Sequence, residues 1–261
     1  MLNFLIEGYI KIILQCLSII IIIKIFDKLM KLEKEDVEIY QLNKSTVFSL
    51  IAVFTYIILS FIYLKYFESV FPQNGILKSI IVKVGILSPT ILFIILNKEK
   101  LSSLGISKKN ILNSIIIGLI CSLVYMVTYI IINNSNYFLA ISRIDFKLFV
   151  SLLYLFVYCM VIAIVEEFLY RGYLQTRLVA SYGNKRGLLF STIIFTLMHL
   201  PQWMSNNNFS ISITDILLQG SGILPLSFVF GYLYMKTKNL TSCIILHTFS
   251  NWIVFALKQF R

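Results

Sequence analysis

Long apolar stretches dominate the chain, and most polar residues lie between them. A helix that crosses a bilayer needs roughly 20 mostly apolar residues. Eight stretches approach or reach that length: Tyr9–Phe26, Val47–Leu64, Ile76–Leu96, Ile111–Ile132, Leu148–Val165, Gly187–Leu200, Ile216–Met235 and Asn239–Leu257. They are continuously apolar, whereas the strands of a membrane barrel alternate polar and apolar positions. The pattern predicts an all-α, polytopic membrane helix bundle of about eight transmembrane helices.

Two of these stretches fit the pattern less well. Ile76–Leu96 carries Lys78 and Lys83 in its first half, and Gly187–Leu200 is short unless it extends past Pro201. We therefore expect seven or eight spans, with eight preferred. No linker rich in Gly, Ser or Pro divides the chain, so residues 1–261 are predicted to form a single integral membrane domain.

Composition supports a membrane protein and changes how the charge is interpreted. The chain is 58% hydrophobic and 13% charged, against about 25% charged residues in soluble domains, and its mean hydropathy is +0.86. The net charge of +11 could indicate a nucleic-acid partner. In a membrane protein it instead reflects basic loops that stay in the cytoplasm, so we expect no nucleic-acid partner.

Basic residues gather after the odd-numbered stretches, which predicts that both termini lie outside and the odd-numbered loops lie in the cytoplasm. These residues are Lys28, Lys31, Lys34, Lys44, Lys98, Lys100, Lys108, Lys109, Arg171, Arg177, Lys185, Arg186, Lys236 and Lys238. The four cysteines all lie in apolar stretches, and none forms a CxxC pair. We expect them to be buried structural thiols.

Ionisable residues inside membrane spans are costly and therefore candidate functional groups. The adjacent Glu166 and Glu167 close an uncharged apolar run. If the helix continues, Glu167 and Arg171 are four residues apart and form an ion pair on one face, while Glu166 points about 100° away. Glu166 would then be available as a base, although the same cluster could also be a polar collar at the membrane interface.

Two further motifs follow at helical spacing. Phe195 and His199 share a face of the sixth stretch, and His247 and Asn251 share a face of the eighth. His199 and His247 are the only histidines in the chain. Taken singly, each motif is also explained by buried polar groups that hold helices together.

Taken together, the motifs Glu-Glu-x3-Arg, Phe-x3-His and His-x3-Asn resemble the CAAX-processing and bacteriocin-processing family of intramembrane proteases, also called the Abi family. The resemblance extends to Leu104-Gly105-Ile106 and to Gly231-Tyr232-Leu233-Tyr234 with Thr237-Lys238-Asn239-Leu240. It is specific over about Leu148–Asn251 and implies a protease core at about 148–257. The N-terminal spans match only in being hydrophobic.

The chemistry of these side chains, taken without the resemblance, favours catalysis of hydrolysis. A carboxylate, two imidazoles and a carboxamide can activate water and stabilise an oxyanion. The resemblance implies that Glu166 is the general base and that His199 shares its water. It implies that His247 and Asn251 form the oxyanion pocket or help to position the water. A membrane peptide or protein is the implied substrate, and the lipid bilayer is the other expected partner.

The resemblance also implies supporting residues around these four. Glu167 and Arg171 would hold the helix and the first carboxylate in register, and Phe195 would pack beneath His199. The protein would then be an endopeptidase of the cell membrane, and its chain would cross that membrane several times.

Dependence on a metal is left open by the sequence. Glu166, His199 and His247 would resemble the ligands of a catalytic zinc site, but the motif HExxH is absent. We therefore favour a mechanism without a cofactor and keep Zn²⁺ as the alternative.

Two other classes of function are weighed against a protease. A proteolytically silent bacteriocin-immunity or membrane scaffold protein would keep the fold, but it would not need the complete set of Glu166, His199, His247 and Asn251. A proton-coupled carrier would be expected to show broken helices in two related halves, and no such repeat is visible.

Overall fold

The computed structural model describes residues 2–30, 39, 41–70, 75–132 and 145–259, and every regular element in these ranges is helical. The elements are α1 (Leu2–Met30), α2 (Leu42–Ile62), η1 (Tyr63–Phe67), α3 (Ile76–Leu96), η2 (Leu101–Leu104), α4 (Ile111–Ile132), α6 (Phe146–Glu167), η3 (Phe168–Gln175), α7 (Thr176–Leu197), α8 (Leu200–Asn206), α9 (Ile213–Thr237) and α10 (Leu240–Lys258). Helices satisfy their own backbone hydrogen bonds, which lipid cannot do.

The helical segments are long and apolar enough for a multi-pass membrane protein. Seven segments of the described chain meet the requirements of a membrane span. Helix α1 shows the lipid-facing pattern clearly, because its outward positions are large apolar side chains about a turn apart: Ile10, Leu14, Leu17, Ile21 and Ile25. The predicted polytopic helix bundle is therefore confirmed.

The predicted fifth and sixth spans lie within one long helical segment, Phe146–Asn206, of 61 residues. The chain reverses inside it at Gly183, which has φ 80° and ψ 165° and lies between the two halves of α7. This positive φ favours glycine. A Cβ on Gly187 would lie 2.5 Å from the Val179 Cα, so the two halves are in close contact. One continuous segment therefore holds two antiparallel halves.

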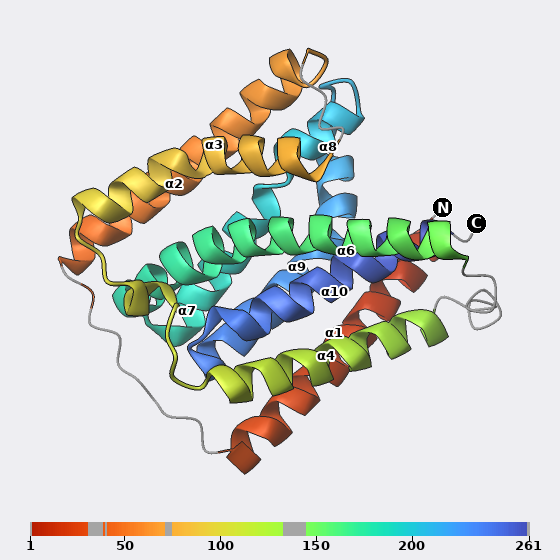
Figure 1. Cartoon of the computed structure of the whole chain (residues 1–261), viewed down its shortest axis with the longest axis horizontal. Helices are drawn as coiled ribbons and strands as arrows, with labels where there is room; N and C mark the ends of the chain where they lie inside the picture. Colours follow the sequence, from red (N-terminus) through yellow and green to blue (C-terminus); the bar gives the residue numbers. More distant parts are fainter. Residues whose placement is uncertain (1, 31–38, 40, 71–74, 133–144, 260–261) are drawn as a thin grey trace.

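Helix α10 is the central helix of the bundle. In its most apolar window 56% of the residues are buried, against 22–33% in the other spans. It packs between α4 and α6, while α1 packs against α4 and α9, and α2 pairs with α3 beside α6 and α7 (Figure 1). Asn239 caps α10 by accepting from the Thr241 amide at 2.9 Å. Its Nδ2 donates to the Ser107 carbonyl at 2.7 Å, which ties this helix to the loop before α4.

Two separate hydrophobic clusters form the core. One lies among α1, α4, α9 and α10, and the other among α2, α3, α6, η3 and α7. His247 contacts both clusters, through Phe230 of the first and Phe195 of the second. The four cysteines are buried free thiols, as expected.

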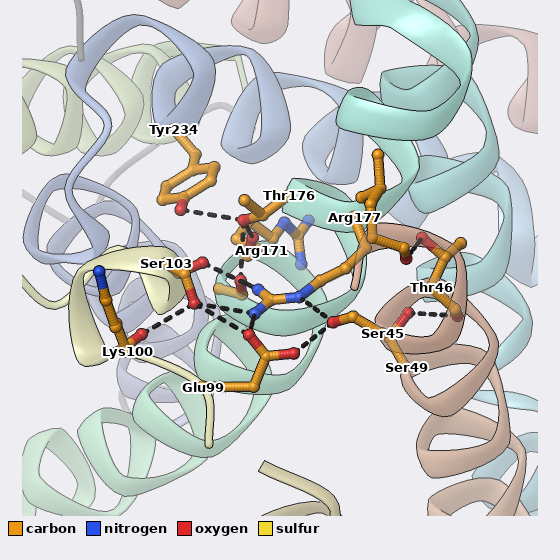
Figure 2. Close-up of polar contacts among 12 residues, drawn as sticks. Ser45, Thr46, Ser49, Glu99, Lys100, Ser103, Arg171, Thr176, Arg177 and Tyr234 are labelled. Carbon is orange, nitrogen blue, oxygen red and sulfur yellow. Dashed lines mark hydrogen bonds and ion pairs between the residues drawn. The ribbon is translucent and has the colours of Figure 1, made fainter. Parts of the chain in front are cut away.

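A buried polar cluster around Arg177 joins α2, η2 and α7 (Figure 2). The Arg177 guanidinium donates to Glu99 at 2.8 Å, to the Ser103 carbonyl at 2.8 Å and to the Ser45 hydroxyl at 3.1 Å. Ser45 also donates to Glu99. Close approach of the backbone is needed here, because a Cβ on Gly172 would lie 2.5 Å from the Leu104 carbonyl oxygen.

The burial of two arginines corrects part of the membrane topology that was predicted from charge. Arg171 and Arg177 were counted as loop residues after the fifth span, but both lie in helix and are only 1% and 0% exposed. They were misread because their sequence neighbours Lys185 and Arg186 are exposed. In that loop only Lys185 and Arg186 still support the predicted cytoplasmic location.

Candidate active site

A cavity of about 590 Å³ opens among α2, η1, α3, α6, α8, α9, α10 and the end of α7. Its lining includes Glu166, Phe195, His199, His247 and Asn251. These residues come from three segments that are distant in the sequence. The structure therefore brings together all four predicted catalytic side chains in one cavity.

The two glutamates end α6 and point to different surroundings. Glu166 is 8% exposed and lines the cavity, while Glu167 is fully buried. Helix α6 continues beyond them as the π-helix η3, so Glu166 lies inside a long helix and not at its end. π-Helical turns are rare and often occur at functional sites.

The imidazole of His247 lies between the two carboxylates. Its Nδ1 is 2.7 Å from Oε1 of Glu167, and its Nε2 is 3.8 Å from Oε2 of Glu166. An ionised carboxylate only accepts hydrogen bonds, so Nδ1 donates to Glu167. In the neutral ring Nε2 is then an acceptor that faces Glu166. Phe230 stacks on the same imidazole, with 4.8 Å between ring centroids.

Arg171 supports Glu167 from the other side. Its Nε lies 3.2 Å from Oε2 of Glu167, and the guanidinium donates to the carbonyl and hydroxyl oxygens of Ser227 at 3.1 Å each. The guanidinium carbon also lies 3.9 Å from the centroid of the Phe195 ring, in a cation–π contact. Glu167 thus has both the predicted ion pair with Arg171 and a second partner, His247, which sequence spacing did not reveal.

His199 lies where α7 meets α8. Its Nδ1 is 3.1 Å from the Phe195 carbonyl oxygen, and since a carbonyl only accepts, Nδ1 donates and Nε2 remains an acceptor. The imidazole stacks on Trp203 with 6.0 Å between centroids. Phe195 meets it edge-on at 5.3 Å and also lies 6.1 Å from the His247 ring. Phe195 therefore contacts both histidines.

The possible metal ligands around the cavity already have protein partners. Among the residues that the structure describes, no three His, Cys, Asp or Glu side chains are grouped so that they could hold a metal ion. Nδ1 of His247 already binds Glu167, and the Lys83 ammonium lies 3.8 Å from Oε1 of Glu166. A cation beside Glu166 opposes a divalent ion at that carboxylate.

Sequence reasoning missed several residues of this site. Lys83, Tyr158 and Trp203 contact the cavity or its histidines, and Ser227 binds Arg171. Lys83 could have been found by the rule that marks ionisable residues in membrane spans as functional, since it lies inside the third apolar stretch. The others have no sequence signal apart from their side-chain chemistry.

One comparison with known proteins covers the segment that holds the predicted site residues. A family model described as type II CAAX prenyl endopeptidase Rce1-like matches residues 148–253. No curated protein and no solved structure matches the chain. The matched residues begin in α6 and end in α10, so they contain every predicted site residue. Over this segment the chain is similar to Rce1-like type II CAAX prenyl endopeptidases.

Proposed function

We propose that this protein hydrolyses peptide bonds of membrane-associated peptides or proteins, with water activated by Glu166. The family supports an intramembrane endopeptidase of the CAAX type. The observation that carries the finer proposal is the imidazole of His247 held between the carboxylates of Glu166 and Glu167. A carboxylate and an imidazole acceptor thereby face each other inside one cavity.

The gap between these two acceptors fits one water molecule. Oε2 of Glu166 and Nε2 of His247 are 3.8 Å apart, and a water oxygen can lie about 2.8 Å from both. Its two hydrogens would then point at the two acceptors, and its lone pairs would point into the cavity. Such a water is oriented to attack a carbonyl carbon.

The proposed reaction balances without another reactant. Glu166 takes a proton from the water as the new C–O bond forms, and the proton then passes to the leaving nitrogen as the C–N bond breaks. The amide of Asn251, one turn after His247 in the same cavity, donates to the oxyanion. Of the two roles expected for His247, this assignment keeps the positioning of the water, because its Nε2 faces Glu166 as an acceptor, and it leaves the oxyanion to Asn251.

Glutamine in place of Glu167 is expected to lower kcat by about 10- to 100-fold, the loss seen when the carboxylate that orients a metal-ligating histidine is replaced. The amide can donate to Nδ1 of His247, which would favour the wrong tautomer and turn Nε2 into a donor. The kinetics of peptide cleavage test this. An unchanged kcat in a folded Glu167→Gln protein would contradict the orienting role.

Cleavage is expected to be independent of zinc. Purified protein in lipid vesicles is incubated with a library of membrane-associated peptides, including prenylated peptides with CAAX ends, and the products are identified by mass spectrometry. The wild type is expected to cleave equally with and without a zinc chelator, and Glu166→Gln serves as the control without the base. Loss of cleavage with chelator and its recovery with added zinc would establish a metalloprotease instead.

The same assay separates an enzyme from a silent scaffold or immunity protein. Full function of Glu166→Gln in cells, together with equal product patterns from both proteins in vitro, would overturn the protease proposal.

A further inference from the structure

Lys83 lies in an unusual position for a lysine. It is on α3, seven residues after Ile76, roughly 10 Å from the start of a helix that is otherwise mostly apolar. Its side chain is only 17% exposed. A charge so buried on an apolar helix is costly unless it is balanced within the protein.

The group that balances it is Glu166. The Lys83 ammonium lies 3.8 Å from Oε1 of that carboxylate, while Oε2 faces His247 at 3.8 Å. The two oxygens therefore have different neighbours. An ion pair on Oε1 restricts rotation of the carboxylate and leaves Oε2 directed at the proposed water.

The numbers of positive and negative charges in the site also indicate that Lys83 is the partner of Glu166. Glu167 already has Arg171 as its cation at 3.2 Å. Of the described residues that line the cavity, Lys83 is the one Lys or Arg, and Glu166 is the one Asp or Glu. Two carboxylates are thus matched by two cations, one for each.

The remaining polar groups near Lys83 cannot replace it. Tyr56 and Tyr158 also line this side of the cavity, and Tyr170 meets the Tyr56 ring edge-on at 6.4 Å. Their phenol groups can donate hydrogen bonds but carry no positive charge. His199, in the same cavity, uses its Nδ1 on the Phe195 carbonyl.

We infer that Lys83 is a positioning residue for peptide hydrolysis, whose ammonium holds one oxygen of Glu166 and balances its charge so that the other oxygen faces the attacking water. This inference rests on the proposed function. It assigns a role to the N-terminal half of the chain, which lies outside the residues matched by the family model.

Kinetics of peptide cleavage test the role. With the best-cleaved peptide of the library, Lys83→Met is expected to lower kcat by about 10- to 100-fold, as when a reacting group is misplaced, and to leave KM unchanged. Lys83→Arg is expected to keep most of the activity. Lys78→Met is the matched control, because Lys78 lies on the same helix but is exposed, and it should behave as the wild type.

Chemical rescue tests whether the charge itself matters. Lys83→Ala leaves space in the cavity, so added ethylammonium is expected to restore part of kcat, whereas ethanol at the same concentration is not. A purely structural role for Lys83 would not distinguish these two molecules.

A stability measurement tests the contact without any substrate. The double variant Lys83→Met/Glu166→Gln is expected to unfold closer to the wild-type temperature than Lys83→Met does, since it removes both charges at once. Additive effects of the two changes would contradict the pair.

The outcomes separate failure of this inference from failure of the proposed function. If Glu166→Gln is inactive while Lys83→Met has a normal kcat, Lys83 has no positioning role and the proposed function stands. A raised KM with normal kcat would mean that Lys83 binds substrate instead. If Glu166→Gln is fully active, the proposed function fails, and the inference about Lys83 fails with it.

Discussion

Replacing Glu166 with glutamine is expected to reduce kcat for peptide cleavage by about 10² to 10⁴-fold, the usual contribution of a general base. Glutamine has nearly the same shape, and its amide oxygen can still accept a hydrogen bond from water, but it cannot take up the proton. KM should change little, because the substitution removes an interaction that matters mainly in the transition state. Rates measured at saturating peptide with protein in lipid vesicles check this.

A matched control for this substitution lies on the outer surface of the bundle. Glu7 on α1 is 64% exposed at its side chain and pairs with Lys11, so Glu7→Gln makes the same chemical change outside the cavity. It is expected to have wild-type kinetics. Retention of more than half of the wild-type kcat by folded Glu166→Gln would exclude Glu166 as the base.

Replacing Arg177 with methionine is expected to destabilise the folded protein by about 3–5 kcal/mol, the cost of leaving a buried charge without its partner. The Glu99 side chain is 1% exposed and would keep only hydroxyl partners, Ser45 and Ser103 (Figure 2). The Ser103 carbonyl would also lose its donor. Unfolding of the protein in mixed micelles, followed by circular dichroism against denaturant concentration, measures the loss.

Two further variants identify the cause. Arg177→Met/Glu99→Gln removes both charges and is expected to recover part of the lost stability, whereas Arg186→Met changes an exposed arginine and should change stability little. Equal stability of Arg177→Met and the wild type would show that the buried pair contributes nothing to the fold.

Apolar periodicity predicts most of this fold, because lipid requires helices wherever the chain crosses it. The same periodicity does not show the reversal at Gly183 within α7, since a single glycine near charged residues reads as an ordinary loop. It also does not show η3, because no residue type in this eight-residue segment distinguishes i→i+5 from i→i+4 hydrogen bonding.

The candidate site was predictable where partners lie on one helix and hidden where they do not. The spacing of Glu167 and Arg171 predicts their ion pair, because residues four apart share a helix face. The contact of Glu167 with His247 joins residues 80 positions apart, and no local rule reaches that distance. Lys83 was treated as a weakness of the third span, although a charge that is costly in lipid is itself a sign of a partner.

The π-helix η3 also affects which changes of length the chain can tolerate. It lies between the carboxylates at the end of α6 and Arg177 near the start of α7. Loss or gain of one residue there would rotate everything that follows relative to Glu166, because each residue turns the helix by a set angle. Arg177 would then turn away from Glu99, even if every side chain in the segment were kept. An insertion or deletion in η3 would therefore separate the cavity from the buried cluster around Arg177.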